Sequence, residues 1–174
     1  MKNTNLTRAK KWLNSAITDI KRVLNDLKMK DFADVAFRSQ FAVEKINKAI
    51  LNLFAIKIEK VHNPSTILED FLKGEKKLTL NNKTKSILKK IIADSKVFEN
   101  EGTKTIYGSF EQGELITAEE IYDSFNDIKK LLIALNYIIT NLTSFLQYSL
   151  KKTRNQSKII NELNELSEML QEWI

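Results

Sequence analysis

The segment from Phe32 to Leu53 constrains the fold more than any other part of the chain, because its apolar and small residues keep the spacing of one helix. They recur at steps of three and four, at Phe32, Val35, Ala36, Ser39, Ala42, Val43, Ile46, Ala49, Ile50 and Leu53. With 3.6 residues per turn, all of them lie on one side of a helix. Gln40, Glu44 and Lys48, spaced by four, form a polar row beside that stripe. The pattern predicts a helix from Asp31, its N-cap, to about Phe54.

Similar patterns predict further helices before and after this segment. Residues 6–27 have one apolar face, which predicts the first helix. Pro64 suits the first turn of a short helix that ends near Gly74. In residues 82–100 the apolar residues again have helical spacing. The sequence contains only 4 Gly and 1 Pro. We therefore predict an all-α, up-and-down bundle of about five or six helices.

The longest segment without helical periodicity runs from Gly102 to Ile116 and holds three of the four glycines. We interpret it as a candidate functional loop. Thr117 and Glu120 form a T-x-x-E capping box, and the apolar residues after it predict one helix to about Lys152, about 50 Å long.

Residues 153–174 predict a separate amphipathic helix after a bundle of residues 1–152. Its apolar residues are spaced by four, three, four and three, at Ile159, Leu163, Leu166, Leu170 and Trp173. This is a short heptad seam. The helix either folds back on the bundle or pairs with a second copy of the chain.

Composition excludes several kinds of site. The chain has no cysteine and one histidine, which excludes disulfides and thiolate or histidine-rich metal centres, and we expect neither metal nor cofactor. The N-terminus lacks the apolar core of a signal peptide, and no apolar run approaches about 18 residues. These features predict a cytoplasmic protein without a membrane segment.

The formal net charge is +6, and lysines are concentrated between residues 73 and 90. A candidate nucleic-acid patch there consists of Lys76, Lys77, Lys83, Lys85, Lys89 and Lys90. The same lysines also fit the solvated face of a helix, because the segment contains no arginine and few aromatic residues to stack on bases. Binding through them would weaken steeply with added salt.

The run S-Q-F-A-V-E-K-I-N-K-A-I, residues 39–50, resembles the signature Q-Q-A-x-E-K-x-x-K-A in the second helix of HEPN domains. In that family a loop histidine follows, which here would be His62. The resemblance implies a small helical bundle. It leaves the activity open, because HEPN proteins include metal-independent ribonucleases, toxin-system subunits paired with nucleotidyltransferases, and non-catalytic domains.

HEPN ribonucleases carry an R-x(4–6)-H motif, whose arginine binds the phosphate and whose imidazole transfers protons. None of the four arginines here, Arg8, Arg22, Arg38 and Arg154, precedes a histidine at that spacing. Residues 104–117, where the resemblance places the motif, contain neither residue, although Lys104 and Tyr107 are candidate phosphate ligands. The remaining catalytic candidates are His62 and Arg38, and His62 equally fits a histidine that fixes a loop by hydrogen bonding.

Two interpretations of Gln40, Glu44, Lys45 and Lys48 remain. They form either a ladder of ion pairs on the helix surface or a ligand-binding row that faces a groove and orients a nucleotide. We predict a non-catalytic binding or regulatory module that forms a homodimer and pairs with a nucleotidyltransferase in a toxin–antitoxin type of system. The alternatives are a ribonuclease with a degenerate site and an RNA-binding protein that uses the lysine-rich face.

Overall fold

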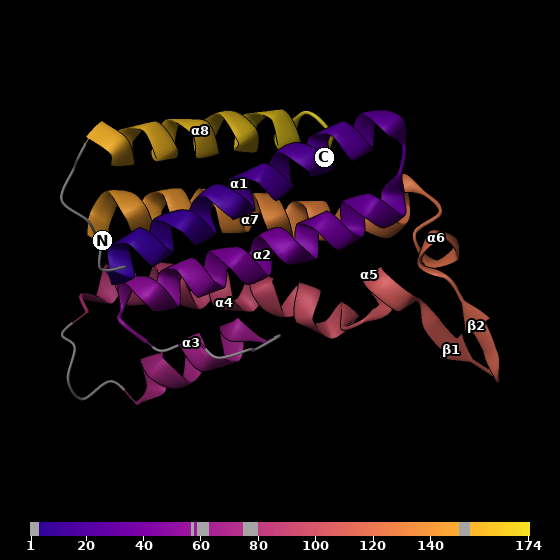
Figure 1. Ribbon diagram of the computed structural model, residues 1–174, viewed down its shortest axis with the longest axis horizontal. Helices are drawn as coiled ribbons and strands as arrows, with labels where there is room; N and C mark the ends of the chain where they lie inside the picture. The colour runs from indigo at the N-terminus through magenta and orange to yellow at the C-terminus, as the bar shows by residue number, and fades with distance from the viewer. Residues whose placement is uncertain (1–3, 57, 59–62, 75–79, 150–153) are drawn as a thin grey trace.

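The computed structural model describes residues 4–56, 58, 63–74, 80–149 and 154–174, which form eight helices and one two-stranded sheet. Helix α1 (Asn5–Met29) and helix α2 (Phe32–Leu53) form an antiparallel hairpin that lies over α7 (Phe125–Ser149) (Figure 1). Helix α4 (Asn82–Glu101) packs along α7, and the short α3 (Pro64–Lys73) packs against α2 and α4. The predicted all-α bundle is confirmed.

The caps explain where the first helices begin and end. Thr4 caps α1 by accepting a hydrogen bond from the Thr7 amide at 3.2 Å, and α1 ends at Lys30 in the left-handed conformation, with φ of 59°. The Asp31 side chain accepts from the Asp34 amide at 3.1 Å, as predicted for the start of α2. Pro64 occupies the first turn of α3 as predicted, but the Asn63 side chain makes no capping bond.

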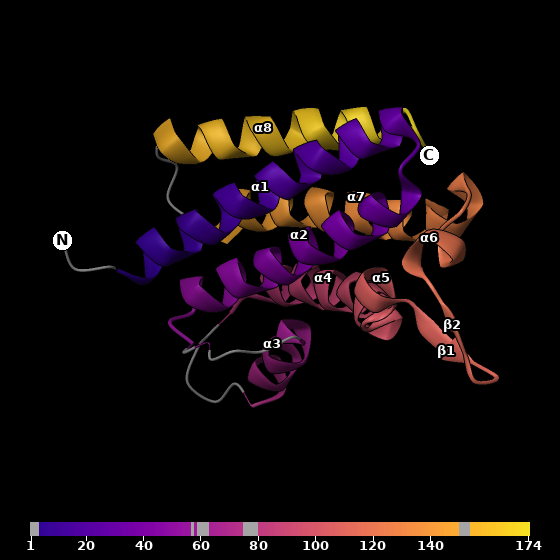
Figure 2. The ribbon, with the colours of Figure 1, turned by 45° about the vertical axis from the view of Figure 1, so that its right-hand side comes forward.

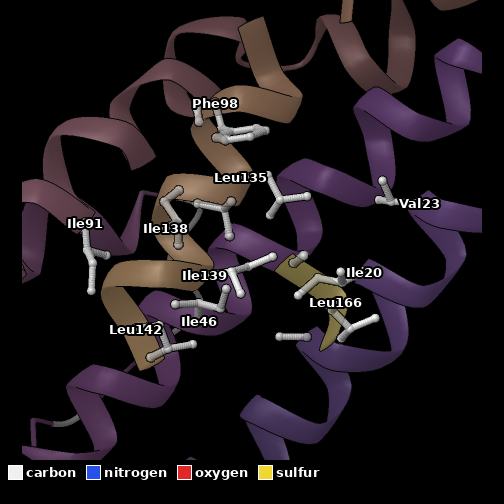
Figure 3. Packing of buried hydrophobic residues seen from close by; sticks show 14 of the residues in the cluster. Ile20, Val23, Ile46, Ile91, Phe98, Leu135, Ile138, Ile139, Leu142 and Leu166 are labelled. Atoms are coloured by element: carbon white, nitrogen blue, oxygen red, sulfur yellow. The ribbon is translucent and has the colours of Figure 1, made fainter. Parts of the chain in front are cut away.

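The core is formed mainly by the inward stripes of the long helices, with Leu68 of α3 also fully buried in it. Figure 3 shows side chains from α1, α2, α4, α7 and α8 meeting, among them Ile20, Ile46, Ile91, Ile139 and Leu166. The stripe predicted on α2 is buried at all of its central positions. Removal of this apolar surface from water is the main term that stabilises the bundle.

The prediction of a single helix from Thr117 to Lys152 is wrong. The capping box of Thr117 and Glu120 is present, but the helix it starts, α6 (Ala118–Ile121), ends at Tyr122. Tyr122 is buried and its hydroxyl donates to Glu101 at 3.0 Å. A new helix, α7, then begins beside Ser124, whose amide donates to the Asp127 carboxylate at 2.8 Å.

Helix α7 has the length and mean hydropathy, 1.2, of a helix that could cross a membrane, but 61% of its most apolar window is buried inside the bundle. It is about 37 Å long at 1.5 Å per residue, shorter than predicted. Helix α8 (Arg154–Gln171) covers part of it and lies beside α1 (Figures 1 and 2). The inward residues Leu163, Leu166 and Leu170 of α8 are buried.

The segment predicted as a loop, Gly102 to Ile116, contains regular structure. A single-turn helix, α5 (Lys104–Tyr107), leads into a hairpin of β1 (Ser109–Glu111) and β2 (Glu114–Ile116). Gln112 and Gly113 both have positive φ, 52° and 90°, as the central residues of a type I′ turn require. The hairpin projects from one end of the bundle (Figures 1 and 2).

Candidate functional site

The row predicted on α2 contacts α1 through Lys48 and the start of the α5 segment through Gln40. Glu44 and Lys48 form an ion pair along the helix, and their side chains are only 21% and 12% exposed. The Lys48 ammonium also lies 5.1 Å from the centre of the Trp12 ring of α1. Lys48 is therefore held between a carboxylate and an aromatic face, both of which attract its ammonium group.

Gln40 connects the row to α5. Its side-chain amide donates to the Gly102 carbonyl oxygen at 2.8 Å, and its oxygen accepts from the Thr105 hydroxyl. Both partners of Gln40 belong to the connection between α4 and the hairpin. The bonds bring Lys104 and Tyr107 close to the N-terminal half of α2, where both side chains are exposed.

Lys45 faces α1 and is paired with Asp19, which is 2% exposed. Arg22 lies 3.3 Å from the other oxygen of the same carboxylate. The two cations offset the cost of removing a carboxylate from water, and the Lys45 ammonium also lies 5.7 Å from the centre of the Phe41 ring. Lys45 therefore joins α1 to α2 rather than facing a groove.

Arg38 lies about two helical turns before Lys45 on α2. Its guanidinium carbon is 5.1 Å from the centre of the Phe37 ring, and its Nε atom is buried without a hydrogen-bond partner. Burial raises the pKa of Asp26 on α1, the nearby Asp34 raises it further, and the charge of Arg38 opposes both effects. Arg38 thus belongs to a charged cluster between the two helices.

The other catalytic candidate, His62, lies outside the described residues, as do Lys76 and Lys77 of the lysine patch. Of the remaining lysines, Lys83, Lys89 and Lys90 are exposed on α4, whereas Lys85 is half-buried and engaged within the chain. The Lys83 ammonium lies 3.5 Å from the centre of the Tyr148 ring, and its hydrogen bond lowers the pKa of Tyr148.

Sequence reasoning missed Trp12, Asp19 and Thr105, the residues that hold the row in place. Asp19 carried a usable signal, since it falls on the apolar stripe of α1 with Ala16 and Val23 one turn away on either side. A carboxylate at such a position requires a cation from a neighbouring helix. Trp12 and Thr105 carried no signal, because their contacts depend on the pairing of separate segments.

No group of three or more histidine, aspartate or glutamate side chains suited to a metal ion occurs within the described ranges. A groove of about 830 Å³ lies between α1 and α8, away from the row. Its walls carry both signs of charge, with Lys21 and Lys28 on α1 opposite Lys158, Glu162 and Glu165 on α8. The salt bridge from Lys21 to Glu162, 2.6 Å long, spans the two helices.

The structure is a helical bundle whose second helix carries a polar row. Comparison with protein families identifies the family to which it belongs. The family model of the HEPN domain matches residues 9–138, about three quarters of the chain, and the chain belongs to this family. The match covers α1 to the middle of α7, including the hairpin, and ends before α8. Neither the curated proteins nor the solved structures include one that matches the chain.

Proposed function

We propose that this HEPN protein is a non-catalytic binding or regulatory module. One observation carries the proposal: the polar groups of the α2 row are engaged inside the chain. Gln40 holds α5, Glu44 and Lys48 hold each other, and Lys45 neutralises a buried carboxylate. Side chains that already have these partners serve to position helices, and a ligand would have to replace each contact at a comparable cost.

The absence of a proton carrier in the right place supports the same proposal. Cleavage of RNA at a 2′-hydroxyl needs a group that accepts and returns a proton near neutral pH, and imidazole is the side chain best suited to do so. The sequence has one histidine, His62, and its nearest preceding arginine, Arg38, is far outside the spacing of the ribonuclease motif. Arg38 itself is packed against Phe37 and faces Asp26.

The experiment is an RNA cleavage assay with purified protein. End-labelled tRNA and total RNA are incubated with the wild type, with His62→Ala and with Arg38→Ala. Arg8→Ala, which removes a positive charge from an exposed position, is the matched control. We expect the same fragments as in the protein-free reaction for all four proteins. Cleavage by the wild type that disappears in His62→Ala, and persists in Arg8→Ala, would show a degenerate ribonuclease instead.

A module without catalysis acts through its partners, and we propose two of them from the family resemblance. The first is a second copy of the chain and the second is a nucleotidyltransferase in a toxin–antitoxin type of pair. A neighbouring gene that encodes a small nucleotidyltransferase would support the second partner. Failure of the two proteins to co-purify after co-expression would count against it.

A further inference from the structure

The end of the bundle formed by α5, β1 and β2 exposes an unusual concentration of apolar side chains. Phe110 is 77% exposed, Tyr107 70%, Leu115 53% and Ile106 39%. We call these four residues the hairpin patch. Single exposed apolar residues are common on protein surfaces, but four within ten positions of one segment are typical of an interaction site.

The hairpin presents this patch in a fixed geometry. Phe110 lies directly opposite Leu115 in the sheet, so both side chains emerge on the same face. Gly108 permits the entry into β1, since its φ is 72° and a Cβ there would lie 1.9 Å from the Ile116 carbonyl oxygen. Through the bonds of Gln40 to Gly102 and Thr105, α2 anchors the base of the segment.

The strands also offer hydrogen bonds. Within the part of the chain that the structure describes, β1 and β2 pair only with each other, so the outer edge of each strand has no neighbouring strand. An isolated two-stranded hairpin is marginally stable, and a third strand added at an edge would complete backbone hydrogen bonds while covering the apolar face.

The charge of this end restricts the partner. Residues 102–127 contain one lysine and six carboxylates, in a chain whose formal net charge is +6. Glu111 lies opposite Glu114 beside the turn, an arrangement of like charges that destabilises the free hairpin. An RNA or an anionic lipid surface would be repelled here, and two hairpins paired with each other would bring four of these glutamates together.

We propose that the hairpin patch is a docking surface for an extended segment of a protein partner that alternates basic and apolar residues. The apolar residues would cover Phe110 and Leu115, and the basic residues would neutralise Glu111 and Glu114. The choice of a protein as partner rests on the proposed function as a non-catalytic binding module, whereas the position and charge of the surface do not depend on it. The RNA cleavage assay does not involve the patch, so the two proposals fail in different experiments.

The test uses a fluorescent peptide of alternating lysine and valine, about eight residues long, which is an ordinary strand length. Its binding to the full chain is followed by fluorescence anisotropy, beside a peptide in which glutamate replaces each lysine. We expect the lysine peptide alone to bind, with an affinity that falls as salt is added. Phe110→Ser/Leu115→Ser should raise Kd by at least about tenfold.

Two further variants separate the patch from general charge attraction. Glu111→Gln/Glu114→Gln should weaken binding and remove most of its salt dependence. Leu6→Ser, which replaces an apolar residue that is 62% exposed on α1, should bind like the wild type. Equal binding of the two peptides, or equal loss in Leu6→Ser and in the patch variant, would overturn the proposal. So would light scattering that shows self-association through the patch.

Discussion

Replacement of Lys45 by methionine tests whether the α2 row has a structural role. The substitution keeps most of the apolar stem but removes the cation from a carboxylate, Asp19, that is 2% exposed. Removing one partner of a buried ion pair costs about 3–5 kcal/mol. Because Arg22 remains 3.3 Å from the same carboxylate, we expect the low end of that range, about 3 kcal/mol of the free energy of unfolding.

The assay is urea unfolding followed by circular dichroism, with thermal unfolding beside it. For a chain of this size, a loss of about 3 kcal/mol lowers the midpoint temperature by about 6–12 °C. Lys21→Met is the matched control, because it breaks the Lys21–Glu162 pair, whose side chains are 55% and 30% exposed. An exposed pair of this kind contributes about 0–1 kcal/mol.

The double variant Asp19→Leu/Lys45→Met separates the ion pair from side-chain packing. With both charges replaced by apolar groups no buried carboxylate is left unpaired, and we expect its stability to return to within about 1 kcal/mol of the wild type. The reasoning is refuted if Lys45→Met is no more destabilising than Lys21→Met. It is also refuted if the double variant loses as much stability as the single variants Asp19→Leu and Lys45→Met combined.

Two other predictions follow from contacts on α2 and α3. Gln40→Ala should lower the free energy of unfolding by about 1–2 kcal/mol and speed amide exchange over residues 102–107, whereas the exposed Gln147→Ala should leave both unchanged. Hydrogen bonds from Lys96 and Lys73 lower the pKa of Glu69 from 4.5 to about 2. Because the pKa of Glu69 is lower in the folded state, its ionised carboxylate stabilises the folded protein fully above pH 4.5. This stabilisation disappears as the pH falls through about 2. A wild type that is not more heat-stable than Glu69→Gln at neutral pH, or a difference that persists below pH 2, would contradict this interpretation.

The helices of the N-terminal half could be predicted from sequence because local signals set both their faces and their ends. The stripe of α2, the cap at Asp31 and the proline in the first turn of α3 need no information from distant residues. The break before α7 was missed because Ile121, Phe125 and Ile128 keep helical spacing across it. Ser124 and Asp127 did signal a new start, in the S-x-x-D pattern of an N-cap.

The site could be predicted only in part, because spacing within one helix is visible in the sequence whereas contacts between separate segments are not. Spacing along one helix placed Gln40, Glu44 and Lys48 in a row, and this arrangement is local. Whether that row faces a ligand or a neighbouring helix depends on tertiary contacts. These are the register of α1 against α2 and the position of α5, which follows α4, against α2. Gly113 is a local signal for a turn, but Gln-Gly is not one of the dipeptides typical of a two-residue hairpin, so the sequence predicts a loop there.

The polar row and the hairpin patch are parts of one arrangement, because Gln40 belongs to the first and supports the second. The residues of the polar row on α2 lie mostly against other parts of the same molecule, whereas the exposed apolar side chains of the hairpin patch lie on α5 and the hairpin, at the end of the bundle. Two hydrogen bonds from Gln40 join these regions. A row that fixes the position of a projecting hairpin gives a partner a preorganised surface, which lowers the entropy lost on binding. In the docking that we propose, the polar row on α2 supports recognition by positioning the hairpin, while the hairpin patch makes the contact itself.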